Sequence, residues 1–278
     1  MAGLAAGLAP QAVFALSEPA ELEARLAESG HLLADAPVYA VDRRVAAKLS
    51  TLESPAALMA VFPVPVPPAL GELRSPRPAG AAARDASPSG LPAGGRHLIV
   101  YADRLADPGN LGTLVRAAAA FAAAALVASP GSVDLFSPKV VRAGMGAVFA
   151  LPLYQDVPLA RAVDELHAGP VYGLVAHDGR PLDEVAAAIA DGPAGDPYAA
   201  GGAASTGPAA SAGPAILVIG AERAGLSTDA LACVTDLVTI PLAGATGGGV
   251  ESLNAGVAGA IALYELSRPR RPQGARKE

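Results

Sequence analysis

From residue 97 onward, short apolar runs alternate with longer stretches in which apolar residues recur three or four positions apart. The first pattern is typical of buried strands and the second of amphipathic helices. Strands are predicted at His97–Ala102, Ala125–Ser129, Leu151–Tyr154, Val171–Ala176, Ala215–Ile219 and Leu237–Pro241. Helices are predicted at Asn110–Ala122, Ser137–Met145, Leu159–Ala168 and Ser252–Ser267. This alternation indicates an α/β fold, in which a parallel sheet is covered by helices on both faces.

The chain before residue 97 is patterned more weakly. Its predicted elements are a helix at Pro19–Gly30, a strand at Pro37–Val41, a helix at Asp42–Leu49 and a strand at Ala57–Phe62. Two stretches rich in Gly, Ala, Ser and Pro lack periodicity, which indicates a linker at Pro63–Gly95 and an insert at Gly192–Pro214. We therefore divide the chain into a first domain (1–70), a flexible linker (71–96), a second domain (97–268) that contains a low-complexity insert (192–214), and a basic tail (269–278).

Composition raises the question of a membrane protein, since 52% of the residues are hydrophobic, 17% are charged and the mean hydropathy is +0.38. However, even a long apolar run such as Ala117–Ala128 falls short of the roughly 20 residues that a membrane-spanning helix needs. The apolar start, Met1–Leu16, has no Lys or Arg before it, which argues against a signal peptide. We therefore expect a soluble, cytoplasmic chain.

The net charge and the few cysteines and histidines argue against further classes of protein. The net charge of −6 argues against a protein that holds nucleic acid through bulk positive charge, so any such contact must be local. Cys233 is the single cysteine, which excludes an intramolecular disulfide and a zinc site built from cysteines. The four histidines lack the spacing of metal ligands, and no metal site is predicted.

Polar residues that follow predicted strands are the best candidates for chemistry, because open α/β sheets bind ligands at the carboxyl ends of their strands. Asp107-Pro108-Gly109-Asn110 is a turn signal that leads into a helix, with Asn110 at or near the N-cap, and Arg116 follows in that Ala-rich helix. One interpretation is a capped helix with a solvated arginine. The other is a helix start that presents amides and an arginine to an anionic or ribose-like group.

Two later loops have a similar position. Glu222 lies just past a predicted strand, between Gly220 and Gly225, which suits either a flexible strand-to-helix turn or a ligand-binding loop. In the other, a strand ends at Pro241 and a Gly-rich loop leads into a helix with Ser252 and Asn254 in its first turn. Gly lets the backbone approach a ligand, and Ser and Asn supply neutral donors and acceptors. Neither a P-loop nor a dinucleotide-binding fingerprint is present.

Together, and in this order, the loops resemble the three motifs of the SpoU (TrmH-like) RNA 2′-O-ribose methyltransferases, which belong to the SPOUT superfamily. The matching segments are Asp107–Gly112 with Arg116, Gly220–Leu226, and Ile240–Leu242 with Glu251–Asn254. The resemblance spans about residues 97–268 and includes Ser137–Gly146. Ala36–Phe62 is similar to the end of the L30e-like RNA-binding domain that precedes many members. The basic opening segment of that domain has no match, so a partial L30e-like domain is expected.

The resemblance implies a C-terminal trefoil knot, a homodimer, and S-adenosylmethionine as the cofactor for methylating a ribose 2′-hydroxyl of RNA, with rRNA favoured over tRNA. It implies a cofactor pocket lined by Gly220, Ile240, Leu242 and Leu253. The residue it assigns to the 2′-hydroxyl is Arg116. Because a guanidinium is almost never deprotonated in proteins, we expect this side chain to orient the ribose or phosphate and stabilise negative charge rather than to act as a base.

The remaining implied catalytic residues are Asn110, Glu222, Ser252 and Asn254, which would position Arg116 and the ribose. Glu222 also fits a helix-start carboxylate favoured by the helix dipole. Lys139 and Arg142 suit either a solvated helix face or a contact with the RNA backbone. An alternative function from the same sequence is an RNA-binding or assembly module with the knotted fold and little or no methyltransferase activity. A small-molecule O-methyltransferase is a third hypothesis.

Overall fold

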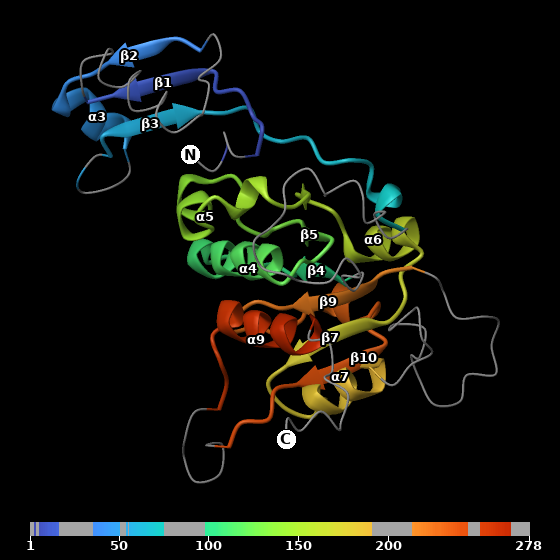
Figure 1. Ribbon diagram of the computed structural model, residues 1–278. Coiled ribbons are helices and arrows are strands. Elements are labelled where there is room, and N and C mark those ends of the chain that lie inside the picture. The colour runs from blue at the N-terminus through green and yellow to red at the C-terminus, as the bar shows by residue number, and fades with distance from the viewer. Residues whose placement is uncertain are drawn as a thin grey trace, which may run out of the picture.

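The protein has two sheets (Figure 1), one of three strands and one of seven. The computed structural model describes residues 3, 6–16, 36–50, 54, 56–74, 98–190, 213–243 and 251–267. Among these residues, no helix combines the length and the apolar character that crossing a membrane requires.

The large sheet has the strand order β6-β5-β4-β9-β7-β10-β8, and all its neighbouring strands pair in parallel. Its strands are β4 (Leu98–Ala102), β5 (Ala125–Ala128), β6 (Leu153–Tyr154), β7 (Val171–Val175), β8 (Arg180–Pro181), β9 (Ala215–Ile219) and β10 (Asp236–Thr239). Every residue of β4, β5 and β9 is buried, as expected for strands with neighbours on both sides and helices above and below. The predicted α/β fold with a parallel sheet is confirmed.

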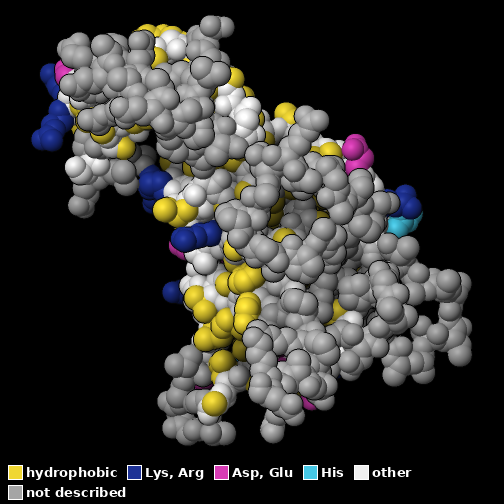
Figure 2. Space-filling view, in the orientation of Figure 1, with side chains coloured by type: hydrophobic (Ala, Val, Ile, Leu, Met, Phe, Trp, Pro, Cys, Tyr) yellow, Lys and Arg dark blue, Asp and Glu magenta, His cyan; other side chains and the backbone are white. Residues whose placement is uncertain are grey.

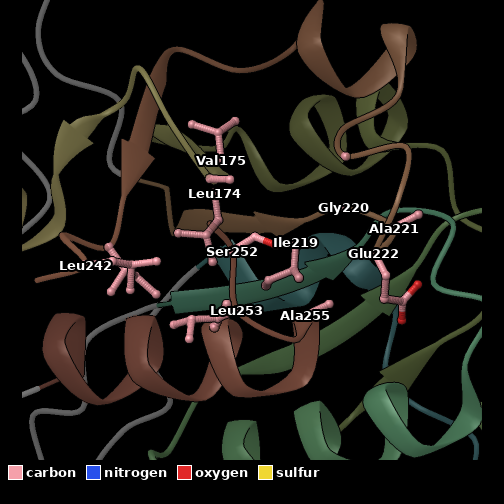
Figure 3. A pocket seen from close by; sticks show the side chains of 14 residues that line it. Leu174, Val175, Ile219, Gly220, Ala221, Glu222, Leu242, Ser252, Leu253 and Ala255 are labelled. Atoms are coloured by element: carbon pink, nitrogen blue, oxygen red, sulfur yellow. The ribbon is translucent and has the colours of Figure 1, made fainter. Parts of the chain in front are cut away.

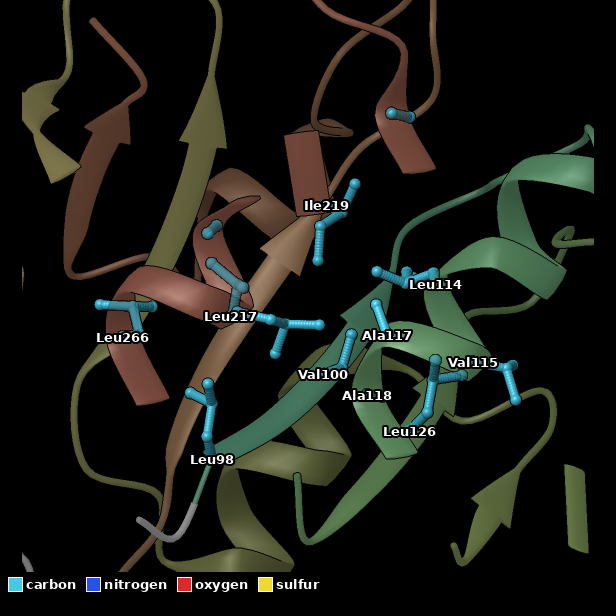
Figure 4. Close-up of a cluster of buried hydrophobic side chains, with 14 of the residues drawn as sticks. Leu98, Val100, Leu114, Val115, Ala117, Ala118, Leu126, Leu217, Ile219 and Leu266 are labelled. Atoms are coloured by element: carbon cyan, nitrogen blue, oxygen red, sulfur yellow. The ribbon is translucent and has the colours of Figure 1, made fainter. Parts of the chain in front are cut away.

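Helices cover both faces of this sheet. They are α4 (Pro108–Ala120), α5 (Pro138–Ala143), α6 (Leu159–Leu166), α7 (Leu182–Ala190), α8 (Thr228–Leu231) and α9 (Ala255–Ser267). Alternate residues of β4 point to opposite sides: Leu98 and Val100 pack with α4, α5, α7 and α9 (Figure 4), while Ile99 and Tyr101 pack with α6 and α8. The two faces therefore carry two separate hydrophobic cores.

Small residues let the helices on the Leu98 and Val100 side of the sheet approach one another closely. A Cβ atom added at Gly259 of α9 would lie 2.6 Å from Leu114 Cδ1 of α4, and one at Gly256 would lie 3.1 Å from the Asn110 carbonyl oxygen. Gly112 of α4 is in similarly close contact with the backbone of α5. Consequently α4 lies tightly between α5 and α9, and its first turn lies against the start of α9.

The small sheet has the order β2-β1-β3, in which β1 (Ala12–Ala15) pairs in parallel with β2 (Val38–Ala40) and antiparallel with β3 (Leu58–Val61). Helix α3 (Arg43–Leu49) starts at the N-cap Asp42, whose side chain accepts a hydrogen bond from Val45 N. The predictions for β2, α3 and β3 are thus confirmed to within a residue or two at each end. The predicted helix Pro19–Gly30 lies outside the described residues.

The segment after the small sheet packs against the large one. Tyr154 Oη donates a hydrogen bond to the Pro68 carbonyl at 2.9 Å, and the rings of Phe62 and Phe149 are in contact. The short 3-10 helix η1 (Leu70–Arg74) buries Leu70 and Leu73 in the core shared with α6. This part of the predicted linker region is therefore ordered against the second domain.

Some elements were not predicted or begin elsewhere. Strands β1 and β8 and helices α7 and η1 were not predicted. Helix α9 begins at Ala255, so the prediction that Ser252 and Asn254 lie in its first turn is wrong. Asn254 precedes the helix, and its side-chain Oδ1 accepts a hydrogen bond from Val257 N at 3.2 Å. This is the position of an N-cap, where Asn is favoured because it satisfies an amide that has no partner within the helix.

Candidate functional site

A pocket opens at the carboxyl ends of β9, β7 and β10, which are neighbours in the large sheet, and is closed by the start of α9 (Figure 3). It contains about 740 Å³ of space, part of which is open to solvent. The lining residues are Leu174, Val175, Ala176, Ile219, Gly220, Ala221, Glu222, Gly225, Ile240, Leu242, Ser252, Leu253, Ala255 and Ala258. This edge of a parallel sheet is where open α/β proteins bind their ligands.

All the predicted cofactor-binding residues, namely Gly220, Ile240, Leu242 and Leu253, line this one pocket. Glu222 and Ser252 line it as well. In Figure 3, Glu222 and Leu242 lie at opposite ends of the view, and Ser252, Ile219 and Leu253 lie between them. Segments that are far apart in the sequence thus converge, as the motif resemblance implies, although the role of each residue stays a prediction.

Glu222 is the only ionisable side chain among the described residues that line the pocket. Its Oε1 accepts a hydrogen bond from Nδ2 of Asn110, a residue of α4 that is 8% exposed. A hydrogen bond to a charged group is stronger than one between neutral groups, and burial of the donor keeps water from competing for it. The first and second predicted loops are therefore joined at the edge of the pocket.

The prediction that Asn110 lies at or near the N-cap needs a correction. The N-cap of α4 is Asp107, whose Oδ1 accepts from Asn110 N at 2.7 Å, and Pro108 is the first helical residue. Pro suits this position because it has no amide hydrogen to satisfy. Since Asp107 caps the helix, the side chain of Asn110 is available to reach Glu222.

The loop that carries Glu222 is closed on itself. Ala221 and Gly225 exchange two backbone hydrogen bonds, of 3.1 and 2.9 Å. Gly225 has a φ of +66°, which favours glycine, and a Cβ atom at Gly220 would lie 2.6 Å from Leu226 N. Both glycines are needed to form the turn, and the same turn supplies a wall of the pocket.

Arg116 and Asn254 lie outside the pocket lining. Arg116 is exposed on α4, and no ion pair joins it to any part of the chain that the structure describes. This geometry matches the solvated arginine of the first interpretation. Asn254 caps α9 and so fixes the start of the helix that follows Ser252 and Leu253.

Two buried tyrosines of the large sheet, Tyr101 and Tyr172, do not line the pocket. Burial raises the pKa of Tyr172 in β7 to about 12, with a further increase from Asp236 that Arg180 opposes. Burial also raises the pKa of Tyr101 in β4, whose hydroxyl donates to the Val157 carbonyl at 3.0 Å. Both phenols therefore stay protonated at neutral pH. Within the described residues, no group of three or more His, Cys, Asp and Glu side chains is arranged to hold a metal ion.

The fold and the pocket define an α/β protein with a ligand site at the carboxyl edge of its sheet. The sequence model of the SpoU rRNA Methylase family matches residues 97–264, and the chain belongs to this family. The resemblance inferred from the three motifs is thereby confirmed.

Two curated relatives share the same region. The chain is 34% identical over 171 residues to the 23S rRNA (guanosine(2553)-2′-O)-methyltransferase RlmP of Bacillus subtilis, covering 60% of this chain and 57% of that protein. It is also 34% identical over 175 residues to a tRNA/rRNA methyltransferase, named as uncharacterized, of Synechocystis, covering 62% of this chain and 38% of that protein. The chain thus spans less than two thirds of the length of these relatives.

Solved structures agree in fold over almost the whole chain. A TrmH-family protein from Porphyromonas gingivalis has a TM-score of 0.64 at 29% identity, covering 97% of this chain and 86% of that one. AviRb, a SpoU methyltransferase from Streptomyces viridochromogenes solved with S-adenosylmethionine, has a TM-score of 0.65, covering 96% and 85%. At 23% sequence identity to this chain, AviRb is evidence for the fold only.

Sequence reasoning missed the wall formed by the end of β7, Leu174 and Val175, together with the next residue, Ala176. These residues end an apolar strand and carry no polar signal, so only the strand order places them at the pocket.

Proposed function

We propose that the protein transfers the methyl group of S-adenosylmethionine to a ribose 2′-hydroxyl of RNA, with rRNA favoured over tRNA. The observation that carries this proposal is the convergence of the second and third motifs on one pocket, with the first motif joined to it through Asn110 and Glu222. The name of the Bacillus subtilis relative supports the 2′-O position and rRNA.

The pocket suits the chemistry of this cofactor. Apolar side chains such as Leu174, Ile240 and Leu253 offer contact for an adenine ring, and the backbone beside Gly220 offers hydrogen-bonding groups without a side chain in the way. Glu222 offers an acceptor for ribose hydroxyls or a cationic group. When bound, S-adenosylmethionine supplies a methyl group on a positively charged sulfur.

The chain's own residues then have to hold the ribose, remove its proton and stabilise the developing negative charge. Arg116 is exposed and has no ion-pair partner in the described parts of the chain, so its guanidinium is free to bind a phosphate or the ribose oxygen. Asn110 orients Glu222, Ser252 faces the pocket, and Asn254 contributes by capping α9. Lys139 and Arg142 of α5, the helix beside α4, would add contacts to the RNA backbone.

A homodimer is part of the proposal. Val257, Ile261 and Tyr264 lie on one side of α9 and are 46%, 38% and 49% exposed, and hydrophobic side chains gather over this helix in Figure 2. Apolar residues at such spacing form a stripe that suits packing against a second copy. We expect Ile261→Glu to shift the protein from dimer to monomer in analytical ultracentrifugation. Equal sedimentation of the variant and the wild type as a dimer would exclude this face.

The trefoil knot, a partial L30e-like first domain and a cytoplasmic location stay predictions. Residues 244–250, which connect β10 to α9 in the sequence, lie outside the described residues.

The deciding experiment incubates the purified protein with labelled S-adenosylmethionine and ribosomal or transfer RNA, and maps 2′-O-methyl sites by mass spectrometry. Label in a ribose of rRNA supports the full proposal, while label in tRNA corrects the RNA. Binding of RNA and cofactor without transfer would favour the assembly module. If folded protein fails to bind the cofactor in calorimetry, the proposal is wrong.

A further inference from the structure

The buried polar side chains among the described residues gather at one place. They are Asp103, Asn110 and Ser129, which are 3%, 8% and 4% exposed, and they follow β4 or β5 at the carboxyl edge of the sheet. Asn110 is joined to Glu222, whereas Asp103 has no place in the site described above. A buried carboxylate is unfavourable unless its oxygens accept hydrogen bonds, so its partners indicate its purpose.

Both oxygens of Asp103 contact one residue, Ser227. Oδ2 accepts from Ser227 N at 2.6 Å, and Oδ1 accepts from Ser227 Oγ at 3.1 Å. Ser227 also caps the short helix α8, since its Oγ accepts from Ala230 N at 3.2 Å. Backbone amides that donate to a buried carboxylate make strong hydrogen bonds, so this contact fixes Ser227 firmly.

Ser227 comes directly after the loop that carries Glu222. That loop starts at Gly220, where β9 ends, and its hydrogen-bonded closure ends at Gly225. The sheet therefore fixes the loop at one end, and Asp103 fixes it at the other. The segment that follows β4 and the segment that follows β9 are connected a second time, by the hydrogen bond between Asn110 and Glu222 at the pocket.

The segment that carries Asp103 is itself held in place. Arg104 has a φ of +54°, a conformation that non-glycine residues keep only where the surroundings enforce it. Its backbone N donates to Ser129 Oγ at 2.7 Å, and its guanidinium pairs with Asp229 at 3.2 Å on the surface. Asp103 thus connects the Glu222 loop to a rigid part of the sheet edge.

We propose that Asp103 is a positioning residue: through Ser227 it sets the pocket wall at Gly220–Gly225 and the direction of the Glu222 carboxylate. Its consequence for methyl transfer rests on the function proposed above, whereas its hold on the loop does not. The two are therefore tested by different measurements.

The test uses the full chain with Asp103→Ala, Asp103→Asn and, as a matched control, Asp229→Asn. The alanine variant loses both acceptors, while the asparagine variant keeps the shape and an acceptor for Ser227 N. Asp229→Asn weakens the Arg104–Asp229 ion pair, which also joins the segment after β4 to the segment after β9 but is exposed to solvent. Each variant is measured for cofactor affinity by calorimetry, for kcat and KM, for RNA affinity, for thermal unfolding, and for amide exchange of residues 220–227.

We expect Asp103→Ala to raise the Kd and KM for S-adenosylmethionine by about tenfold, Asp103→Asn by about threefold, and Asp229→Asn by less than about twofold. Amide exchange of residues 220–227 should accelerate in the same order, with RNA affinity unchanged. Partial recovery in Asp103→Asn would show that geometry is preserved through the remaining acceptor.

A purely structural role would lower the melting temperature but leave Kd, KM, kcat and loop exchange of the folded protein as in the wild type, and that result overturns the proposal. If Asp103→Ala does not fold, Asp103→Asn decides by the same criteria. If the wild type binds no cofactor, the proposed function is wrong, and amide exchange alone decides: equal exchange in wild type and Asp103→Asn overturns the positioning role.

Discussion

Glu222 and Arg116 carry opposite charges on segments that follow central strands of the same sheet, yet within the described residues hydrogen bonds hold Glu222 in place and no ion pair holds Arg116. Glu222 lies on a loop closed by two backbone hydrogen bonds, lines the pocket and accepts from the buried Asn110. Arg116 extends from an exposed side of α4 and does not line the pocket. The half of the site that would hold a cofactor is thus preorganised, whereas the half that would meet RNA is open. The predictions below test this difference.

The largest effect should come from Arg116→Ala. Loss of a group that stabilises developing negative charge costs about 100-fold to 1,000-fold in turnover, while the pocket itself is untouched. We therefore expect methyl transfer to fall by about that factor, with the Kd for S-adenosylmethionine unchanged in calorimetry. Arg161→Ala is the matched control, because Arg161 is an exposed arginine of α6, on the opposite face of the sheet. Equal activity of Arg116→Ala and wild type would contradict the assigned role.

The second test removes the hydrogen bond that holds Glu222 at the pocket. Asn110→Ala leaves Glu222 without its buried donor, and a hydrogen bond to a charged group contributes about 1.5–3 kcal/mol. We expect cofactor affinity to fall about tenfold or more, and turnover with it. Calorimetry and initial rates measure both, with Thr113→Ala on the exposed side of the same helix as the control. If affinity were unchanged, the Asn110–Glu222 contact would not orient the pocket.

A smaller effect is expected from Gly225→Ala. At a φ of +66°, an added Cβ atom costs about 1–2 kcal/mol, although no neighbouring atom lies within 4 Å of it. The free energy of unfolding in urea should fall by about that amount, and cofactor affinity should fall a few-fold because the loop closes less well. The control is Gly131→Ala, which has a φ of +86° and open space but lies outside the pocket lining. An equal loss of stability with unchanged affinity is expected there.

The smallest effect on the pocket is expected at Tyr172, which lies in β7, the strand that also contains Leu174 and Val175 of the pocket lining. Burial raises its pKa from 10.0 to about 12, so the folded state holds the phenol proton more tightly than the unfolded state does. Its contribution to stability is complete below pH 10 and is lost as the pH rises toward 12. Unfolding in urea between pH 9 and pH 12 should show this decline, and Tyr172→Phe should reduce it. A profile that Tyr172→Phe leaves unchanged would contradict the assignment.

The sequence predicted β4, β5 and β9 well because these strands are buried throughout and therefore appear as continuous apolar runs. It missed β1, whose residues Ala12–Ala15 lie within a longer apolar start, and α7, although the buried Leu182, Val185 and Ile189 recur there at helical spacing. The start of α9 was misplaced because Ser252 and Asn254 both suit a first turn, and only the hydrogen bond to Val257 identifies the cap.

The site was predictable where its chemistry lies in local motifs and unpredictable where it depends on pairing between distant segments. Gly220, Ile240 and Leu253 stand in recognisable loops, and all of them line the pocket. Asp103 contacts Ser227 across a sequence separation of 124 residues, and no local pattern marks such a contact. Leu174 and Val175 likewise reach the pocket only because β7 lies between β9 and β10.

The walls of the pocket run in sequence from Leu174 to Ala258, so its last wall belongs to α9. Within the large sheet, a ribosome makes β4, α4 and β5 first, and a nascent chain can begin to fold around them. The ligand-binding surface cannot exist until α9 has left the ribosome and packed against α4. A nascent chain stalled before Ser252 therefore contains every strand of the large sheet but lacks the pocket wall formed by Ser252, Leu253, Ala255 and Ala258.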